Sequence, residues 1–155
     1  MKPVTVSVVV ERPAEEVFDH LAVLANHEAF TDHMLADWTV SGPAEGRHAR
    51  ARARSTAPGP EDWIDIEVID AEAPFRYVER STGAHGHRMT LGVYELEPLW
   101  EDRTRVTFTL AFEKVPAYER LIAPVVRHWV QENNQRALRR LREVLTYDRS
   151  RVLVG

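Results

Sequence analysis

The chain has 155 residues, no cysteine, and 20 Lys and Arg against 24 Asp and Glu, for a formal net charge of −4. This length predicts one domain with one core, and a hydrophobic fraction of 44% excludes an intrinsically disordered chain. The absence of cysteine excludes disulfide bonds, thiolate zinc sites and cysteine nucleophiles, and it fits a reducing compartment.

The basic residues are arginine except for Lys2 and Lys114, and acidic residues outnumber them. The chain therefore has no overall positive field to attract nucleic acid. The most apolar early segment, Val4–Val10, is far shorter than the ~20 residues that span a bilayer, and it is too short and polar for a signal peptide. We expect a soluble, cytoplasmic protein without a nucleic-acid partner or integral membrane association.

The first third of the chain predicts a strand followed by two short helices. Residues 4–10 are rich in β-branched valine, which favours a strand that Arg12-Pro13 ends. Pro13 suits a helix start, and residues 14–24 place Val17, Leu21 and Leu24 on one face. A second short helix is expected over about residues 27–33, after the possible cap Asn26.

From Asp37 the apolar period changes to two, and turn-like Gly and Pro clusters separate the segments. Short connections between consecutive strands favour an antiparallel meander. The predicted strands cover about residues 37–41, 47–56, 63–70, 75–81, 87–97 and 105–115.

The end of the chain predicts a long amphipathic helix over about residues 117–146. Pro124 lies inside it, so either the helix is kinked there or the main helix starts there. Asn134 falls in the middle of the apolar stripe, and Arg127 lies within about 40° of it. Residues 150–155 are expected to form a loose tail. The stripe consists of Ala123, Val126, Val130, Ala137, Leu138, Leu141, Val144 and Leu145.

These elements predict an α+β fold in which a curved antiparallel sheet of about seven strands wraps around the C-terminal helix. The order is one strand, two helices, six strands and one helix, in a single domain over residues 1–155 with its core at 3–146. Sheet and helix can enclose an internal cavity.

Several local segments carry a family resemblance, namely residues 8–18 (VVVERPAEEVF), Gly46, residues 94–98 (YELEP), residues 104–108 (TRVTF) and residues 137–142 (ALRRLR). With this element order, the chain resembles the Bet v1-like helix-grip superfamily, also called START-like or SRPBCC. Within it, the chain is most similar to the bacterial polyketide cyclase/dehydrase and lipid-transport family. The resemblance implies a ligand site between the concave sheet face and the long helix. The superfamily includes cyclases, lipid carriers, hormone receptors and chaperone activators, so function has to be argued from the cavity.

Alternation then assigns the residues that face this cavity. Val106, Phe108, Leu110 and Phe112 are expected to point inward, as are Thr90, Gly92, Tyr94 and Leu96. Met89, Leu91 and Val93 on the opposite face of this strand are also apolar, so alternation alone does not decide which face points inward. A bulge at Gly92 could explain this ambiguity. In the predicted strand over residues 63–70, the inward residues are expected to be Ile64, Ile66 and Val68.

Residues 49, 51 and 53 are Ala, whereas residues 50, 52 and 54 are Arg. Inward Ala either leaves space for a ligand or lets the helix pack closely. The Arg stripe fits a solvated strand face better than an anion site, and four acidic residues of the next strand can neutralise it as cross-strand pairs, namely Glu61, Asp62, Asp65 and Glu67.

Three polar residues are candidates for contact with a ligand: Tyr94 as a donor to a carbonyl, Asn134 as an orienting group, and Arg127 as a partner for a carboxylate or phosphate near the mouth. Each also has a purely structural interpretation, and Phe30 and Met34 are either cavity wall or core. The full predicted ligand-binding set is Phe30, Met34, Ala51, Ile66, Val68, Thr90, Tyr94, Phe108, Leu110, Arg127, Val130 and Asn134.

The sequence carries no motif for a catalytic triad, a phosphate loop or an HExxH zinc site. His85-Gly86-His87 fits solvated imidazoles in a turn better than a metal site. We therefore predict no catalytic residue, metal or cofactor.

Three functions remain open. The aliphatic strand over residues 63–70 favours a carrier or binder of a lipid, polyketide or terpenoid-like molecule. A polyketide cyclase or dehydratase would need a titratable side chain in the cavity near Tyr94, and related cyclases have polar or basic groups where this strand is aliphatic. A protein-interaction module, such as a homodimer, would need an exposed apolar patch, for which Met89, Leu91 and Val93 are candidates.

Overall fold

The computed structural model describes residues 1–154, with side chains described for residues 1–146. The chain begins with β1 (Val4–Val10), α1 (Ala14–Ala22), the 3-10 turn η1 (Leu24–His27) and α2 (Glu28–Thr31). Six strands follow: β2 (Leu35–Ser41), β3 (Arg50–Ser55), β4 (Trp63–Glu72), β5 (Arg76–Gly83), β6 (Arg88–Trp100) and β7 (Arg103–Lys114), with the 3-10 turn η2 (Ala84–Gly86) between β5 and β6. The chain closes with α3 (Ala117–Leu121) and α4 (Ala123–Val154).

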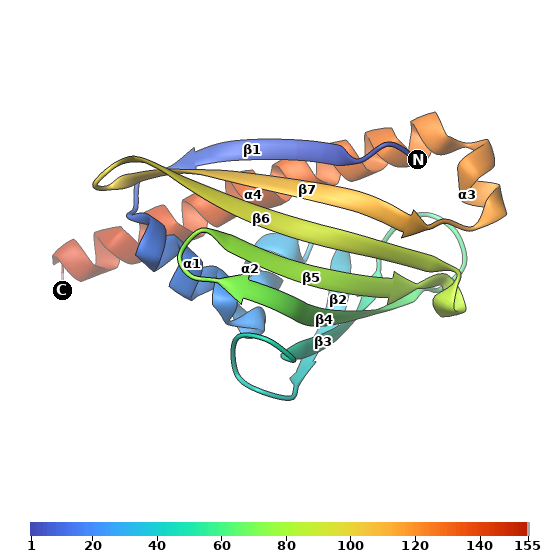
Figure 1. Cartoon of the computed structure of the whole chain (residues 1–155), viewed down its shortest axis with the longest axis horizontal. Helices are drawn as coiled ribbons and strands as arrows, with labels where there is room; N and C mark the ends of the chain where they lie inside the picture. Colours follow the sequence, from blue (N-terminus) through green and yellow to red (C-terminus); the bar gives the residue numbers. More distant parts are fainter. Residues whose placement is uncertain (155) are drawn as a thin grey trace.

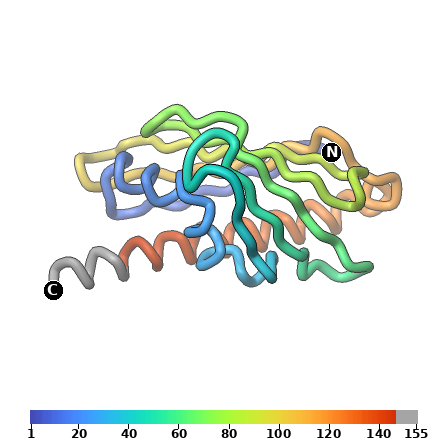
Figure 2. Tube along the Cα trace, turned by 90° about the horizontal axis from the view of Figure 1, so that it is seen from below, coloured from blue at the N-terminus to red at the C-terminus, as the bar shows by residue number. Residues whose placement is uncertain are grey.

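The strands form one antiparallel sheet in the order β1-β7-β6-β5-β4-β3-β2. β2 to β7 make the predicted meander, and β1 joins the far edge by pairing with β7, with Val4 opposite Leu110 and Val10 opposite Thr104. The sheet curves around α4, which runs along its length, while α1 and α2 lie near one end (Figures 1 and 2). The predicted helix-grip architecture is confirmed.

The core lies where α1 and the C-terminal half of α4 meet the sheet. Alternation in β1 buries Val6, Val8 and Val10, which pack with Leu21 of α1 and Leu141 of α4 in one apolar cluster. The same cluster includes Ala137, Leu138 and Leu145, so the C-terminal part of the predicted helix stripe is core. The helix is thereby fixed at one end, which leaves its N-terminal part to form one wall of a cavity.

The predicted C-terminal helix is divided close to Pro124, where the sequence allowed either a kink or the start of the main helix. α3 ends at Leu121, Ile122 leaves helical geometry with φ −115° and ψ 32°, and α4 begins at Ala123. Pro124 is therefore the second residue of α4, where its missing N–H costs no intrahelical hydrogen bond. α4 continues to Val154, so the backbone of residues 150–154 is helical where the sequence predicts a loose tail, and residue 155 lies outside the described residues.

The bulge that would explain the apolar residues on both faces of β6 does not occur at Gly92. The register of β6 and β7 shifts between Met89 and Thr90 and again between Pro98 and Trp100. Gly92 instead lies under an aromatic ring, since a Cβ atom at this position would come within 2.9 Å of Phe108 and 3.2 Å of Glu79. The glycine therefore makes room for a ring on the neighbouring strand.

The Arg stripe of β3 is a solvated, charge-paired face. Arg50 lies 3.6 Å from Glu67 and Arg52 lies 3.1 Å from Asp65 across β4, while Arg54 pairs with Asp37 of β2 at 2.9 Å. Each of these arginines is more than a third exposed, so the pairs contribute little stability individually. The predicted cross-strand neutralisation is confirmed for Asp65 and Glu67, whereas Asp62 pairs with Arg88 and Glu61 accepts a hydrogen bond from Trp63.

Candidate functional site

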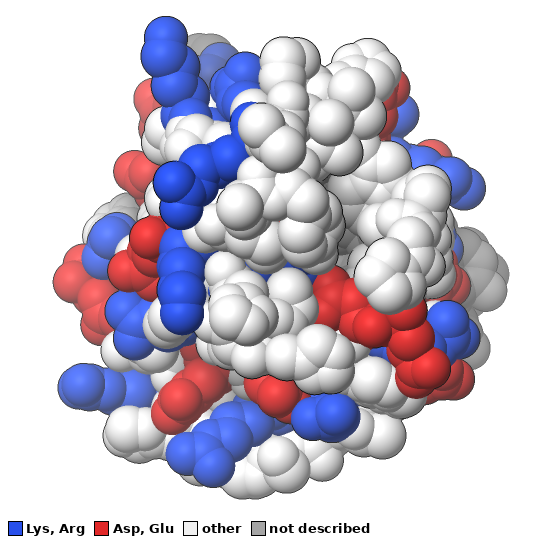
Figure 3. All heavy atoms as spheres, turned by 90° about the vertical axis from the view of Figure 1, so that its right-hand side faces the viewer, with Lys and Arg blue, Asp and Glu red and all other residues white. Residues whose placement is uncertain are grey.

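A cavity of about 840 Å³ lies between the concave face of the sheet and α4. It opens at the end of the molecule where η2, α3 and the loop between β3 and β4 come together, and Figure 3 looks onto that end. Uncharged side chains surround a hollow there, and acidic side chains lie to one side of it (Figure 3). Tyr118, Ile122 and Val125 line the cavity and are about half or more exposed, so they form an apolar rim.

The walls are mainly apolar. The sheet supplies Ile64 and Ile66 from β4, and α4 supplies Val126, Trp129 and Val130. The last strand supplies Phe108, Leu110 and Phe112, in agreement with the predicted inward parity of β7. A site with these walls holds an apolar body by burial rather than by directed bonds.

Most of the predicted ligand-binding residues line this cavity, namely Met34, Ile66, Thr90, Tyr94, Phe108, Leu110, Val130 and Asn134. Phe30, Ala51 and Val68 do not line it but are buried in the core cluster, each at most 4% exposed. The small side chain at Ala51 therefore serves close packing, the alternative interpretation of the inward alanines. Arg127 also lies away from the cavity, where its guanidinium donates hydrogen bonds to the carbonyl oxygens of Lys2 and Pro3.

Two titratable groups on the cavity wall, His27 and Glu79, are buried and lie close to each other. His27 Nε2 lies 2.7 Å from the carbonyl oxygen of Leu21, and its Nδ1 lies 4.0 Å from Glu79 Oε2. Burial lowers the pKa of His27 to about 4 and raises the pKa of Glu79 to about 7. Between about pH 4 and about pH 7, both groups are therefore predominantly uncharged, and the contact is not an ion pair.

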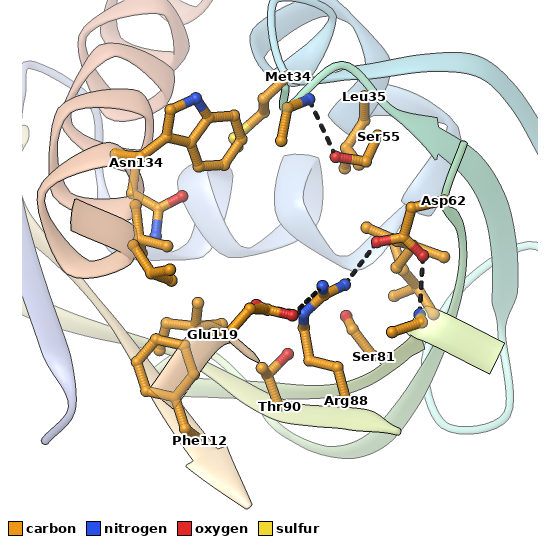
Figure 4. A pocket seen from close by; sticks show the side chains of 18 of the residues that line it. Met34, Leu35, Ser55, Asp62, Ser81, Arg88, Thr90, Phe112, Glu119 and Asn134 are labelled. Carbon is orange, nitrogen blue, oxygen red and sulfur yellow. Dashed lines mark hydrogen bonds and ion pairs between the residues drawn. The ribbon is translucent and has the colours of Figure 1, made fainter. Parts of the chain in front are cut away.

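Three buried polar atoms on the cavity-lining side chains have no hydrogen-bond partner among the described residues: Glu79 Oε2, Asn134 Nδ2 and Trp38 Nε1. Glu79 and Asn134 are only 9% and 6% exposed. Figure 4 shows Asn134 projecting from α4 toward the space that Thr90 and Ser81 face from the sheet. A buried polar atom without a partner costs about 1–3 kcal/mol, which a ligand with a matching group would recover.

A charged cluster lies nearer the mouth, around Arg88 (Figure 4). Its Nε donates to Glu119 at 3.0 Å, and its two terminal nitrogens donate to Glu119 and Asp62. Asp62 also accepts a hydrogen bond from the backbone N–H of Ala84 at 2.7 Å. Burial opposes the charge of Arg88, yet the bonds to Glu119 and Asp62 raise the pKa of this guanidinium above its usual range. The cluster ties α3, β6 and η2 together at the entrance.

The sequence reasoning missed these titratable residues, although alternation contained part of the signal. The inward parity of Thr90 and Tyr94 on β6, continued one step toward the start of the strand, points Arg88 inward. On β5, pairing places Tyr77 opposite Tyr94 and Glu79 opposite Gly92, so the inward set follows from the register. His27 lies in a 3-10 turn, where no periodicity marks a buried face.

The histidines of the predicted turn, His85 and His87, lie at the entrance around η2. Within the described residues, no group of three or more His, Asp or Glu side chains is arranged to hold a metal ion. Across the same residues, no helix is both long and apolar enough to cross a bilayer. The patch expected at Met89, Leu91 and Val93 is half-buried, and the exposed large apolar residues lie elsewhere, several of them on the rim.

The family described as polyketide cyclase / dehydrase and lipid transport matches residues 1–146 of the sequence. The chain belongs to this family. No curated protein sequence matches the chain significantly. The match covers every strand and all the residues that line the cavity.

Several solved structures share this fold. A protein from Thermus thermophilus is 23% identical with a TM-score of 0.72, and the alignment covers 94% of this chain and 98% of that one. A START superfamily protein from Mycobacterium smegmatis is 14% identical with a TM-score of 0.73, over 95% and 99% of the two chains. The Zhui aromatase/cyclase from Streptomyces sp. R1128 is 18% identical with a TM-score of 0.67, over 92% and 95%. At these identities the likeness is one of fold.

Proposed function

We propose that this family member binds one small hydrophobic molecule, such as a lipid, polyketide or terpenoid, in the cavity between the sheet and α4, and acts as a carrier or binding protein. The observation that carries the proposal is the cavity itself, with about 840 Å³ and walls of aliphatic and aromatic side chains. Small-molecule sites have volumes of roughly 300–1,000 Å³ and mainly apolar linings.

The apolar rim supports the same function. Tyr118 is 56% exposed and Val125 is 65% exposed, and they lie in α3 and at the start of α4, beside the entrance. An apolar ligand that enters or leaves along this side of the opening passes over apolar side chains. The transfer from a hydrophobic environment into the cavity therefore exposes less of the ligand to water.

The test is native mass spectrometry of the purified full chain, followed by solvent extraction and identification of any released molecule. We expect a bound mass that extraction removes and that protein refolded from denaturant lacks. Refolded protein should then take up an added apolar probe such as Nile red. Failure to retain any molecule, together with failure to bind the probe, would overturn the proposal.

A second function, cyclase or dehydratase chemistry, is favoured by one specific observation. Glu79 reaches the cavity wall beside Tyr94, with Oε2 unpartnered and a pKa raised by burial to about 7. A carboxyl group with this pKa is suited to general acid–base catalysis of dehydration: its carboxylate form takes the α-proton of a β-hydroxyketone, and the resulting acid gives that proton to the β-hydroxyl group, which leaves as water.

The enzyme candidate is tested by incubating wild type and Glu79→Gln with a β-hydroxyketone and measuring the enone by liquid chromatography. Catalysis by Glu79 predicts a rate that falls by about 10²-fold or more in Glu79→Gln. Equal rates in the two proteins and in buffer would leave binding as the function.

A further inference from the structure

We propose that the cavity selects an uncharged ligand whose hydrogen-bonding oxygen atoms lie at the inner end, such as a ketone or a phenol, and disfavours ligands that carry a carboxylate or a phosphate. This inference rests on the proposed binding function and names the chemical class of the ligand. It follows from the charges on the wall and from the unpartnered polar atoms beyond the entrance.

The charged groups on the wall are unfavourable for an anion. Among the described residues that line the cavity, Arg88 is the one arginine or lysine, whereas the acidic ones are Glu61, Asp62, Glu79 and Glu119. The guanidinium of Arg88 is already bonded to both Glu119 and Asp62. An entering carboxylate therefore meets two carboxylates that share one cation, and it would have to displace one of them from a cluster that is less than a quarter exposed.

The inner part of the wall offers donors instead. Asn134 Nδ2 and Trp38 Nε1 carry N–H groups without a partner among the described residues. Glu79 adds an O–H donor when its carboxyl group is protonated. An oxygen atom of a carbonyl or hydroxyl group accepts such bonds, so it satisfies groups that otherwise stay buried without a partner.

His27 defines a complementary acceptor. A carbonyl oxygen can only accept, so His27 Nε2 carries the hydrogen in its contact with Leu21, and the neutral ring has its lone pair on Nδ1. That lone pair faces Glu79 across 4.0 Å. A ligand hydroxyl group that accepts a hydrogen bond from Glu79 and donates one to His27 would satisfy both side chains. A purely hydrocarbon ligand can make neither hydrogen bond.

The titratable groups around Glu79 come from three elements. His27 faces it from η1, Tyr94 from β6, and Tyr77 from its own strand, with His20 of α1 acting on His27. Burial together with the neighbouring Glu79 raises the pKa of both tyrosines, so they keep their protons at neutral pH. Of His27, Tyr77, Glu79 and Tyr94, Glu79 is therefore the side chain whose charge changes between pH 6 and pH 8.5.

The experiment compares three probes of similar size: naphthalene, 2-acetylnaphthalene and 2-naphthoate. Their affinities are measured by displacement of Nile red from the full chain at about pH 6 and about pH 8.5. We expect the ketone to bind about 5- to 10-fold more tightly than naphthalene at the lower pH, and the carboxylate to bind at least about 10-fold more weakly than the ketone. At the higher pH the advantage of the ketone should shrink, because ionised Glu79 no longer donates.

Two variants assign the effect to Glu79. In Glu79→Leu the advantage of the ketone should fall at both pH values, whereas Glu79→Gln keeps an N–H donor and should lose the pH dependence. Trp38→Phe removes one N–H without changing charge and should reduce ketone binding while naphthalene binding is kept. Circular dichroism checks that each variant is folded.

The outcomes separate this inference from the proposed function. If naphthalene binds and the ketone gains nothing, or if 2-naphthoate binds best, the selection for an uncharged oxygenated ligand is wrong while hydrophobic binding stands. If Nile red and all three probes fail to bind, both proposals are wrong.

Discussion

His27 Nδ1 and Glu79 Oε2 lie 4.0 Å apart, and burial moves the pKa values of these two groups in opposite directions. The acid becomes harder to ionise and the base becomes harder to protonate, so each group resists charge for the same reason. The wall of an apolar cavity thus carries an acid and a base that remain uncharged over the same pH interval, from about pH 4 to about pH 7.

The free energy of unfolding should depend on pH through the protonation of Glu79. Its pKa in the folded state, about 7, exceeds the ordinary value of 4.5, so between these values the native state binds more protons than the unfolded state. The contribution of Glu79 is therefore fully favourable below pH 4.5 and is lost as the pH rises to about 7, by on the order of 3 kcal/mol. Urea unfolding of wild type and Glu79→Gln across this interval measures the difference.

His27 provides the opposite slope in the same experiment. Its folded pKa of about 4 lies below the ordinary 6.5, so its contribution increases as the pH rises from 4 to 6.5 and offsets that of Glu79 in wild type. Glu79→Gln should therefore gain stability with pH more steeply than wild type. Parallel curves for the two proteins would contradict the assigned pKa of Glu79.

Filling the cavity from the sheet should abolish binding. Thr90 is buried and lines the cavity, so Thr90→Trp adds an indole to the space that the ligand needs, and retention of Nile red should fall by about 10-fold or more. The neighbouring Leu91 lies on the other face of β6, so Leu91→Trp is the matched control and should bind normally. Equal binding by both variants would show that the dye lies elsewhere.

Gly92 should tolerate no side chain while Phe108 keeps its ring. A Cβ atom at position 92 would come within 2.9 Å of Phe108 Cε2 and Cζ, so Gly92→Ala should cost about 1–3 kcal/mol in chemical denaturation. Phe108→Leu provides a smaller side chain and relieves the contact. In the Phe108→Leu background, Gly92→Ala should therefore lower the free energy of unfolding by less than it does in wild type. Additive costs would mean that the two residues do not interact.

Arg88 should matter far more than an exposed arginine. Arg88→Met leaves Asp62 and Glu119 close together without their shared cation, and both carboxylates are less than a fifth exposed. We expect a loss of about 2–4 kcal/mol in the free energy of unfolding. The control is Arg105→Met, whose pair with Glu97 is largely exposed and should change stability by about 0.5 kcal/mol or less. Similar losses in both variants would refute a special role for the cluster.

The fold was predictable because its determinants are local and repeated. Alternation along β1, β3 and β7 shows which face is buried, and the short turns allow few topologies. In β3, the strict alternation of Ala and Arg is enough to indicate which face is buried and which is exposed to solvent. Element ends moved by a few residues, since β6 continues to Trp100 where the sequence predicted an end near residue 97.

The site was predictable only where a side chain follows that alternation. Thr90, Tyr94 and Phe108 were placed correctly on the cavity wall, whereas Ala51 and Val68 share their inward parity and yet lie in the core. Parity gives the face of a strand but not the position along the sheet at which core gives way to cavity. Arg127 turns away from the cavity because the carbonyl groups of Lys2 and Pro3 attract it, a contact between distant parts of the chain.

The cavity wall contains Trp38 and Trp129, whereas the other two of the four tryptophans, Trp63 and Trp100, do not line it. Trp100 is 71% exposed and Trp63 donates its indole hydrogen to Glu61. The intrinsic emission of the protein is therefore divided between an outer pair that senses solvent and an inner pair that senses whatever occupies the cavity. Replacing Trp63 and Trp100 by Phe would leave a protein whose own fluorescence reports the arrival and departure of its ligand without a label.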